Sequence, residues 1–330
     1  MAANVETMVF VESDGVPWHG LGTSVTGAMT AQEAIGKAGL DWLVEMRPVF
    51  QAVGGGYLEI PRRKACVRVT DDSALGVFSD SYVPLQNADA FGFFDKVVGE
   101  GQAIYRTAGA LDEGRKVWIL AQLPKAIEPV AGDKILPYLV LCNSFDGSLA
   151  VHMYFTSIRV VCENTLMASF TKEGNSYTAR HVGGLMGKVD DASQALGFAA
   201  KHYEVLEAAM REMQQVSIDA QMVLKFGEKL FPDRAYTLEK LLTMEQGEYL
   251  KSWAAQRRQM LADLVETGAG VEIPGVKGTA YGLYQAAAEV ISHSFKDYRT
   301  AENKLESQWF GQAANRSRQA FDLAMQLGKN

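Results

Sequence analysis

The stretch LAVHMYFTSIRVVCENTL, residues 149–166, joins two different sequence patterns. Apolar and polar side chains alternate from Leu149 to Thr156, and that period of two predicts a β-strand. Farther on, Asn164 or Thr165 can accept hydrogen bonds from the first backbone amides of a helix, so we predict a strand-to-helix junction. The junction concentrates polar side chains and is expected to be either a site or a structural brace, formed by Arg159, Cys162, Asn164 and Thr165.

Strand patterns dominate the chain before this junction, over residues 49–156. Short runs with a period of two alternate with turns rich in glycine and aspartate, such as 54–56 and 112–114. One helical pattern interrupts them, at Asn87–Val98. Because so few crossover helices are present, the strands are expected to pair antiparallel. The predicted strands are 57–60, 64–69, 76–83, 103–109, 116–122, 135–143 and 149–156.

Helical patterns dominate the chain after the junction. Residues 189–224 carry apolar side chains at alternating intervals of three and four, which predicts one long helix with a seam for another helix, within or between chains. Near the N-terminus, Thr30 and Glu33 have the spacing of a capping box before a short helix. The sequence therefore predicts an α+β fold. A mainly antiparallel sheet domain should span residues 1–186, and a helical region, 187–330, should pack on it or mediate assembly.

The composition is that of an ordinary globular protein: 330 residues, 48% hydrophobic and 22% charged. No run approaches the roughly 18 apolar residues of a membrane span, and the first ten residues lack the basic start of a secretory signal. Cys66, Cys142 and Cys162 form no C-x-x-C pair, which favours a reducing compartment such as the cytoplasm. The net charge of −7 argues against indiscriminate coating of duplex DNA but allows a local basic surface.

Five short motifs carry a resemblance to a known family: PWHGLG at 17–22, YVPLQN at 82–87, DGS at 146–148, RVVCENTL at 159–166 and QWFG at 308–311. Through these motifs the chain resembles the phage/plasmid-like DUF932 (UPF0380) family over almost its whole length. The family is named for an unknown role, and its association with mobile elements implies DNA metabolism. A remote similarity of fold and context to Rad52-like single-strand annealing proteins implies single-stranded DNA as the ligand.

Basic side chains and tyrosines gather on the predicted strands and strand ends. Lys64, Cys66 and Arg68 share one strand face, opposite Ala65 and Val67. Single-stranded nucleic acid requires cations for its phosphates and rings that stack on its bases. The alternative interpretation is that these cations are scattered and neutralised by nearby acids. The predicted nucleic-acid-binding residues are Tyr57, Arg62, Arg63, Lys64, Arg68, Tyr105, Arg106 and Arg115.

Catalysis and metal binding have weaker support in the sequence. Cys162 could act as a nucleophile with His152 or His181 as its base, but no catalytic signature surrounds it, and a buried structural cysteine is favoured. Together with Cys142, these residues lack the short paired spacing of structural zinc sites. Arg159 lies between apolar residues, so a buried brace is as well supported there as a phosphate contact. We therefore predict no catalytic residue, no metal and no cofactor.

These observations favour a phage- or plasmid-encoded DNA-recombination or replication protein without covalent chemistry. It is expected to bind single-stranded DNA on its sheet and to anneal strands as a homo-oligomer. Two alternatives stay open. One is an enzyme with a pocket at residues 159–166, which a deep enclosed cleft at Cys162 would favour. The other is an oligomeric scaffold whose sheet binds no nucleic acid.

Overall fold

The computed structural model describes residues 5–11, 23–25, 29–98, 104–123, 125–159, 164–166, 176–188, 191, 199–232, 252–293, 307 and 312–328. Contacts divide the chain into two compact units that interleave along the sequence. Unit 1 contains Met1–Pro124, Tyr138–Phe155 and Lys172–Ala200. Unit 2 contains Lys125–Pro137, Thr156–Thr171 and Lys201–Asn330. The sequence predicts one boundary, after residue 186, whereas the chain passes between the units several times.

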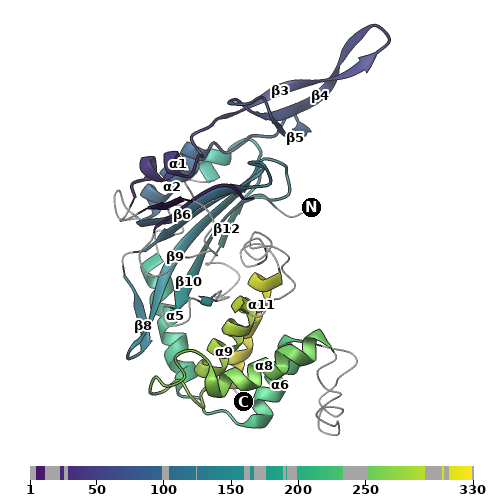
Figure 1. Cartoon of the computed structure of the whole chain (residues 1–330). Coiled ribbons are helices and arrows are strands. Elements are labelled where there is room, and N and C mark those ends of the chain that lie inside the picture. The colour runs from purple at the N-terminus through teal and green to yellow at the C-terminus, as the bar shows by residue number, and fades with distance from the viewer. Residues whose placement is uncertain are drawn as a thin grey trace. The chain divides into compact units, whose positions relative to one another are not determined.

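A nine-stranded sheet contains most of the strands (Figure 1). Its order is β11–β10–β9–β7–β6–β1–β2, with β12 paired to β10 and β8 paired to β9. Among the pairings with a described register, that of β1 with β2 is parallel and the others are antiparallel. The strands are β1 Val5–Val11, β2 Thr23–Val25, β6 Ile104–Leu111, β7 Lys116–Gln122, β8 Ile127–Val130, β9 Asp133–Ser144, β10 Val151–Arg159, β11 Asn164–Leu166 and β12 Ser176–Ala179.

Two helices of unit 1 follow the sequence prediction closely. Helix α1, Ala31–Lys37, begins at the predicted capping box, in which the Thr30 hydroxyl accepts the Glu33 N–H and the Glu33 carboxylate accepts the Thr30 N–H. Helix α2 spans Asn87–Val98, as predicted. The Tyr105 hydroxyl of β6 donates to the Phe91 carbonyl of α2 at 3.2 Å, which anchors α2 to one face of the large sheet.

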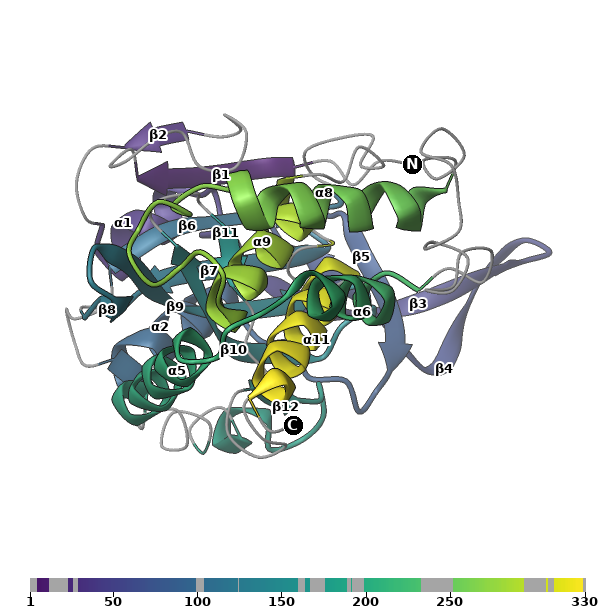
Figure 2. The same cartoon turned by 90° about the horizontal axis from the view of Figure 1, so that it is seen from below.

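A second sheet of unit 1 has three antiparallel strands in the order β3–β4–β5. They are β3 Val44–Val53, β4 Gly56–Arg68 and β5 Ala74–Ser79. Strand β5 pairs only with residues 63–67 of β4. The outer part of the β3–β4 hairpin is therefore a two-stranded ribbon that extends past the end of β5 (Figures 1 and 2).

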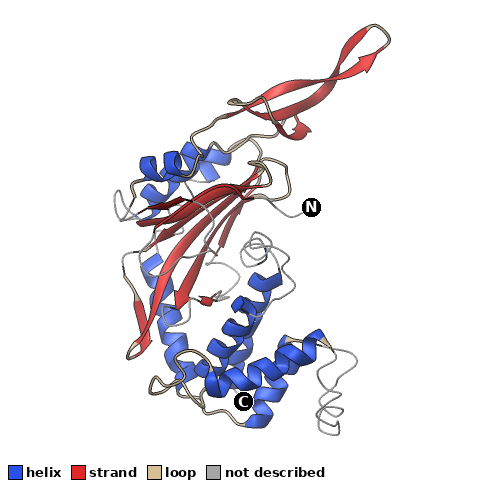
Figure 3. Ribbon diagram, viewed as in Figure 1, coloured by secondary structure: helices blue, strands red, loops and turns tan. Residues whose placement is uncertain are grey.

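Unit 2 is mainly helical (Figure 3). Its central helix is α9, Ala280–His293, which is apolar and buried on nearly all sides. Helix α9 packs against α8, Trp253–Thr267, against α11, Gln312–Leu327, and against β11. The Tyr281 hydroxyl of α9 donates to the buried Asp133 carboxylate at 2.9 Å, which ties the β8–β9 hairpin to this helix. The predicted α+β fold, with a mainly antiparallel sheet in the N-terminal half and helices in the C-terminal half, is confirmed.

The strand-to-helix junction predicted at residues 159–166 is wrong. Asn164, Thr165 and Leu166 form strand β11, which pairs antiparallel with Arg159, Ile158 and Ser157 of β10. The segment is thus a β-hairpin. Asn and Thr are residue types that cap helices, but they are also common outside helices. Here pairing with β10 places Asn164 and Thr165 in a strand.

The single long helix predicted over residues 189–224 is also interrupted. Helix α5 spans Ala199–Gln214 and α6 spans Ala220–Leu230, and Ser217 between them pairs with Thr279. The seam is correct within α5, where Tyr203, Leu206, Met210 and Met213 are buried. After the break the buried positions become Phe226, Gly227 and Leu230, because the Asp219 side chain caps a new helix.

Candidate nucleic-acid interface on the β3–β4 hairpin

We call residues 49–64, the outer part of the hairpin, the arm. Its tip pairs regularly from Val53 opposite Gly56 to Phe50 opposite Glu59. Gly55 at the turn has φ +98°, a conformation that favours glycine. Beyond the reach of β5, both faces of this ribbon are largely exposed. The arm therefore presents its side chains to a ligand from two sides.

A large bulge separates the tip of the arm from its base. Between the Phe50–Glu59 pair and the Pro48–Lys64 pair, β3 contributes one residue and β4 contributes residues 60–63. Bulges of this kind redirect side chains out of a strand ladder. Arg62 lies in the bulge at φ +60°, the left-handed region that non-glycine residues rarely occupy. Its side chain is 86% exposed, and its ion pair with Asp80 is long, at 3.8 Å. An exposed pair of that length contributes little free energy, so Arg62 is available to an anionic ligand.

One face of the arm combines aromatic rings with a cation. Alternation along β3 places Phe50 on the same face as Pro48 and Ala52, and cross-strand pairing adds their partners. Tyr57 is 80% exposed and Phe50 is 52% exposed. Lys64 forms no ion pair within the described part of the chain, and Glu59 is the one carboxylate of the arm. We call this the ring face, and its members are Pro48, Phe50, Ala52, Tyr57, Glu59 and Lys64.

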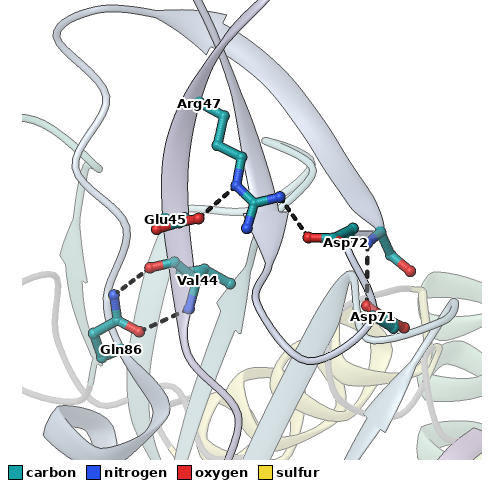
Figure 4. A network of polar contacts seen from close by, with 7 residues as sticks. Val44, Glu45, Arg47, Asp71, Asp72 and Gln86 are labelled. Atoms are coloured by element: carbon teal, nitrogen blue, oxygen red, sulfur yellow. Dashed lines mark hydrogen bonds and ion pairs between the residues drawn. The ribbon is translucent and has the colours of Figure 1, made fainter.

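The base of the arm is held by polar contacts (Figure 4). The Gln86 side-chain amide accepts the Val44 N–H at 3.1 Å and donates to the Val44 carbonyl at 2.9 Å, so it occupies the edge of β3 like another strand. Arg47 forms ion pairs with Glu45, on the same face of β3, and with Asp72, in the turn between β4 and β5. These contacts fix the orientation from which the arm extends.

Arg68 and Tyr105 do not fit the predicted nucleic-acid-binding role. Arg68 is 8% exposed, binds Asp71 at 2.6 Å and stacks over Trp42, and its guanidinium holds the pKa of the Asp71 carboxyl well below its usual range. Tyr105 is 1% exposed and faces α2. The predicted face of Lys64, Cys66 and Arg68 therefore packs inward at its Arg68 end, and only Lys64 reaches solvent.

Arg106 and Arg115 lie on the large sheet and not on the arm. Arg106 donates to the Gln122 side chain across the β6–β7 pair at 2.6 Å. Arg115 follows the β6–β7 turn and pairs with Glu113 at 3.6 Å. Arg63 belongs to the arm, but it pairs with Ser79 and so lies on the face opposite Lys64. Of the predicted residues, Tyr57 and Lys64 belong to the ring face, and Arg62 lies in the bulge between them.

Most of the predicted 159–166 site lies outside the described residues. Cys162 is among the undescribed residues, and the side chains of Arg159, Asn164 and Thr165 are not described, so their roles as brace or site stay predictions. Of the two proposed bases, His152 contacts Thr178 and His181 is buried against the Val83 carbonyl. Burial lowers the pKa of His181.

The other two cysteines are buried free thiols. Cys66 is fully buried, and burial raises the pKa of its thiol to about 12. Cys142 is also fully buried, and its pKa is raised for the same reason. Within the ranges that the structure describes, no three potential metal ligands converge, and no helix is both long and apolar enough to cross a membrane.

Sequence reasoning missed two parts of this region. Phe50 was not recognised because the predicted strand pattern begins at residue 57 and leaves its partner strand unassigned. The motif YVPLQN at 82–87, which we call the strap, is hydrogen-bonded to three distant segments. The Tyr82 hydroxyl donates to the Ser144 carbonyl, and the Val83 N–H and carbonyl bond to the His181 carbonyl and ring. The Gln86 side chain bonds to the Val44 backbone. The hydrogen-bonding partners of the strap could not be predicted from the sequence, because each lies more than 40 residues away in the chain.

Comparison with known proteins identifies one family. The model of a domain of unknown function, DUF932, matches residues 74–309. No curated protein and no solved structure shows significant similarity to the chain. The matched range includes β5, the strap and the 159–166 hairpin, whereas most of the arm precedes it.

Proposed function

We propose that this chain, which belongs to the DUF932 family, binds single-stranded nucleic acid through the ring face of its arm. The observation that carries the proposal is Tyr57, a tyrosine that is 80% exposed on the same arm as the exposed cations Arg62 and Lys64. Single strands bind where bases can stack on rings and phosphates can meet cations. Strand annealing by a homo-oligomer would be a use of this binding.

Charge distribution supports an anionic ligand for the arm. The chain as a whole has a net charge of −7, yet the arm carries three cations and the single carboxylate Glu59. A locally positive segment on an acidic protein attracts phosphate while the rest of the surface repels it. The narrow ribbon also suits a flexible single strand, because the strand's unpaired bases are exposed for stacking.

The proposal is tested by fluorescence-polarisation titrations of single-stranded DNA, single-stranded RNA and duplex DNA at two salt concentrations. Each phosphate contact should contribute about 0.7 to the slope of log affinity against log salt. Replacing Arg62 and Lys64 together by Gln should therefore flatten that slope by about 1.4 units. Tyr57→Ala should cost about 1–3 kcal/mol with little change in slope, since a stacked base releases no counterion.

Matched variants separate this face from a general charge effect. Arg63→Gln removes one cation on the opposite face of the arm, and Arg115→Gln removes one on the large sheet, so neither should change the slope. Glu59→Gln removes the carboxylate of the ring face and should raise affinity. Wild-type protein that binds no oligonucleotide in low salt would eliminate the proposal. An equal loss per cation removed in the Arg62/Lys64, Arg63 and Arg115 variants would mean that binding is nonspecific.

A further inference from the structure

The ring face of the arm places its rings and its cations in two neighbouring parts. Phe50, Tyr57 and Glu59 belong to the regular pairs of the tip, whereas Arg62 lies in the bulge and Lys64 directly after it. Glu59 therefore lies between the rings and the cations along β4. Its side chain is exposed and forms no ion pair or hydrogen bond within the described part of the chain. A carboxylate repels phosphate, so Glu59 does not help to hold the backbone of a bound strand.

Glu59 is a neighbour of both exposed rings. Phe50 is its direct cross-strand partner, and such partners lie about 4.5–5.5 Å apart between their Cβ atoms. Tyr57 is two residues away on the same face of β4, about 7 Å along the strand. The edge of a base that stacks on either ring is therefore within reach of the Glu59 carboxylate.

A carboxylate distinguishes bases by the donors on their Watson–Crick edges. It has two acceptor oxygens and no donor. Guanine presents two adjacent donors, the N1–H and the N2 amino group, which satisfy both oxygens at once. Adenine and cytosine present an amino group beside an acceptor nitrogen, and thymine and uracil present an N–H between two carbonyls. Paired, charge-assisted hydrogen bonds are the stronger and more specific kind, so guanine is the base that fits best.

We propose that Glu59 selects guanine among the bases that stack on the ring face. This selection rests on the proposed single-strand binding by the arm and specifies its ligand as guanine-containing single strands. Tyr57 and Phe50 supply the stacking surface, Arg62 and Lys64 contact the phosphates, and Glu59 binds the base edge. Because this edge is the same in DNA and RNA, both kinds of strand should show the preference.

The selected edge is also the edge that pairs with cytosine in a duplex. Recognition through Watson–Crick edges is open to single strands, whose bases are unpaired. When a complementary strand anneals, the two donors of guanine are taken from Glu59, and its carboxylate again faces a polyanion that it repels. The arm is therefore expected to hold a guanine-containing single strand and to release it on pairing.

The proposal is tested by fluorescence-polarisation titrations of thymine oligonucleotides that carry one substituted base, at one low salt concentration. A single guanine should tighten binding about tenfold over the all-thymine strand, which is the scale of a bidentate base contact. Inosine has the guanine ring system without the N2 amino group and should lose most of that gain. 7-Deazaguanine keeps both donors and should retain it. A matching uracil series shows whether RNA is bound equally, and addition of the complementary strand should abolish the preference.

Glu59→Gln should change the affinities for two of these strands differently. Glutamine has one acceptor oxygen and one amide donor, so the advantage of guanine should disappear. The all-thymine strand should bind more tightly, because a repulsive charge is removed. This combination cannot result from partial unfolding, which weakens both. Glu212→Gln, an exposed carboxylate of α5 outside the arm, is the matched control and should leave both affinities unchanged. Circular dichroism checks that each variant is folded.

The outcomes separate guanine selection from the proposed function. Wild-type protein that binds no oligonucleotide in low salt would eliminate both. Equal affinity for guanine, inosine and thymine strands would overturn guanine selection and leave single-strand binding intact. A preference that guanine shares with inosine would overturn it as well, because stacking alone would explain the result. So would a guanine preference that persists in Glu59→Gln.

Discussion

At the scale of single residues, His181 shows how burial turns an ordinary side chain into a pH-dependent element. It is 7% exposed, its ring stacks on Tyr82 at 4.9 Å, and its Nδ1 contacts the Val83 carbonyl at 3.1 Å. Because a carbonyl can only accept, Nδ1 carries the proton in that contact, and Nε2 is buried with no hydrogen-bond partner among the described residues. A proton added at Nε2 would place an uncompensated charge in the core, which is why burial lowers the pKa of His181.

This lowered pKa predicts a loss of stability in mild acid. Below the ordinary histidine pKa of about 6.5, the unfolded chain binds a proton that the folded chain resists, so the free energy of unfolding falls as pH decreases. Above that pH both states are neutral and the histidine contributes no pH dependence. Chemical denaturation at pH 8 and pH 5.5 should show the loss in wild type and a smaller loss in His181→Gln. His152→Gln is the control, and an equal reduction in both variants would contradict the role of His181.

At the scale of elements, Gln86 tests whether the strap supports the β3–β4–β5 sheet. Gln86→Ala leaves the Val44 N–H and carbonyl without their partner in a partly buried position. The expected cost is about 1–3 kcal/mol in the free energy of unfolding, the penalty for an unsatisfied buried polar pair. Gln51→Ala, on the exposed arm, is the matched control and should have little effect. Urea denaturation measures both, and a neutral Gln86→Ala would show that the strap is not a support.

Elements with local signals could be predicted from the sequence, and elements decided by distant partners could not. The Thr30–Glu33 capping box and the Asp112–Gly114 turn contain their own hydrogen-bonding partners, so α1 and the β6–β7 hairpin were predicted correctly. The Asn164–Thr165 pair has the same local chemistry as a helix start, but pairing with β10 made it a strand. The sequence pattern around Tyr105 is typical of an exposed strand tyrosine. Its burial depends on α2, to which its hydroxyl donates. Tyr57 and Lys64 are exposed on the arm, where no described element covers them, and their role in binding stays a prediction.

At the scale of the whole molecule, the interleaving of the two units makes a simple domain boundary unworkable. Residues 125–137 belong to unit 2 although they lie within the predicted N-terminal domain. Their Asp133 carboxylate is fully buried and accepts a hydrogen bond from Tyr281, about 150 residues later in the chain. Thr156, also assigned to unit 2, accepts the Tyr203 hydroxyl at 2.9 Å. Both partners are lost if the chain is cut after residue 186.

The fragment 1–186 is therefore expected not to fold as an independent domain. Removal of the helices leaves Asp133 without its Tyr281 partner and exposes apolar residues of the β8–β9 hairpin, such as Ile127 and Val130. Loss of a hydrogen bond to a buried carboxylate is destabilising. We expect the fragment to aggregate or to show a broad, noncooperative thermal transition by circular dichroism, with rapid proteolysis of residues 125–160. Full-length Tyr281→Phe separates the two causes: it should remain folded but lose stability, because it removes only the hydrogen bond. A soluble fragment with a sharp transition and well-dispersed amide resonances would contradict the interleaved arrangement and support a boundary near residue 186.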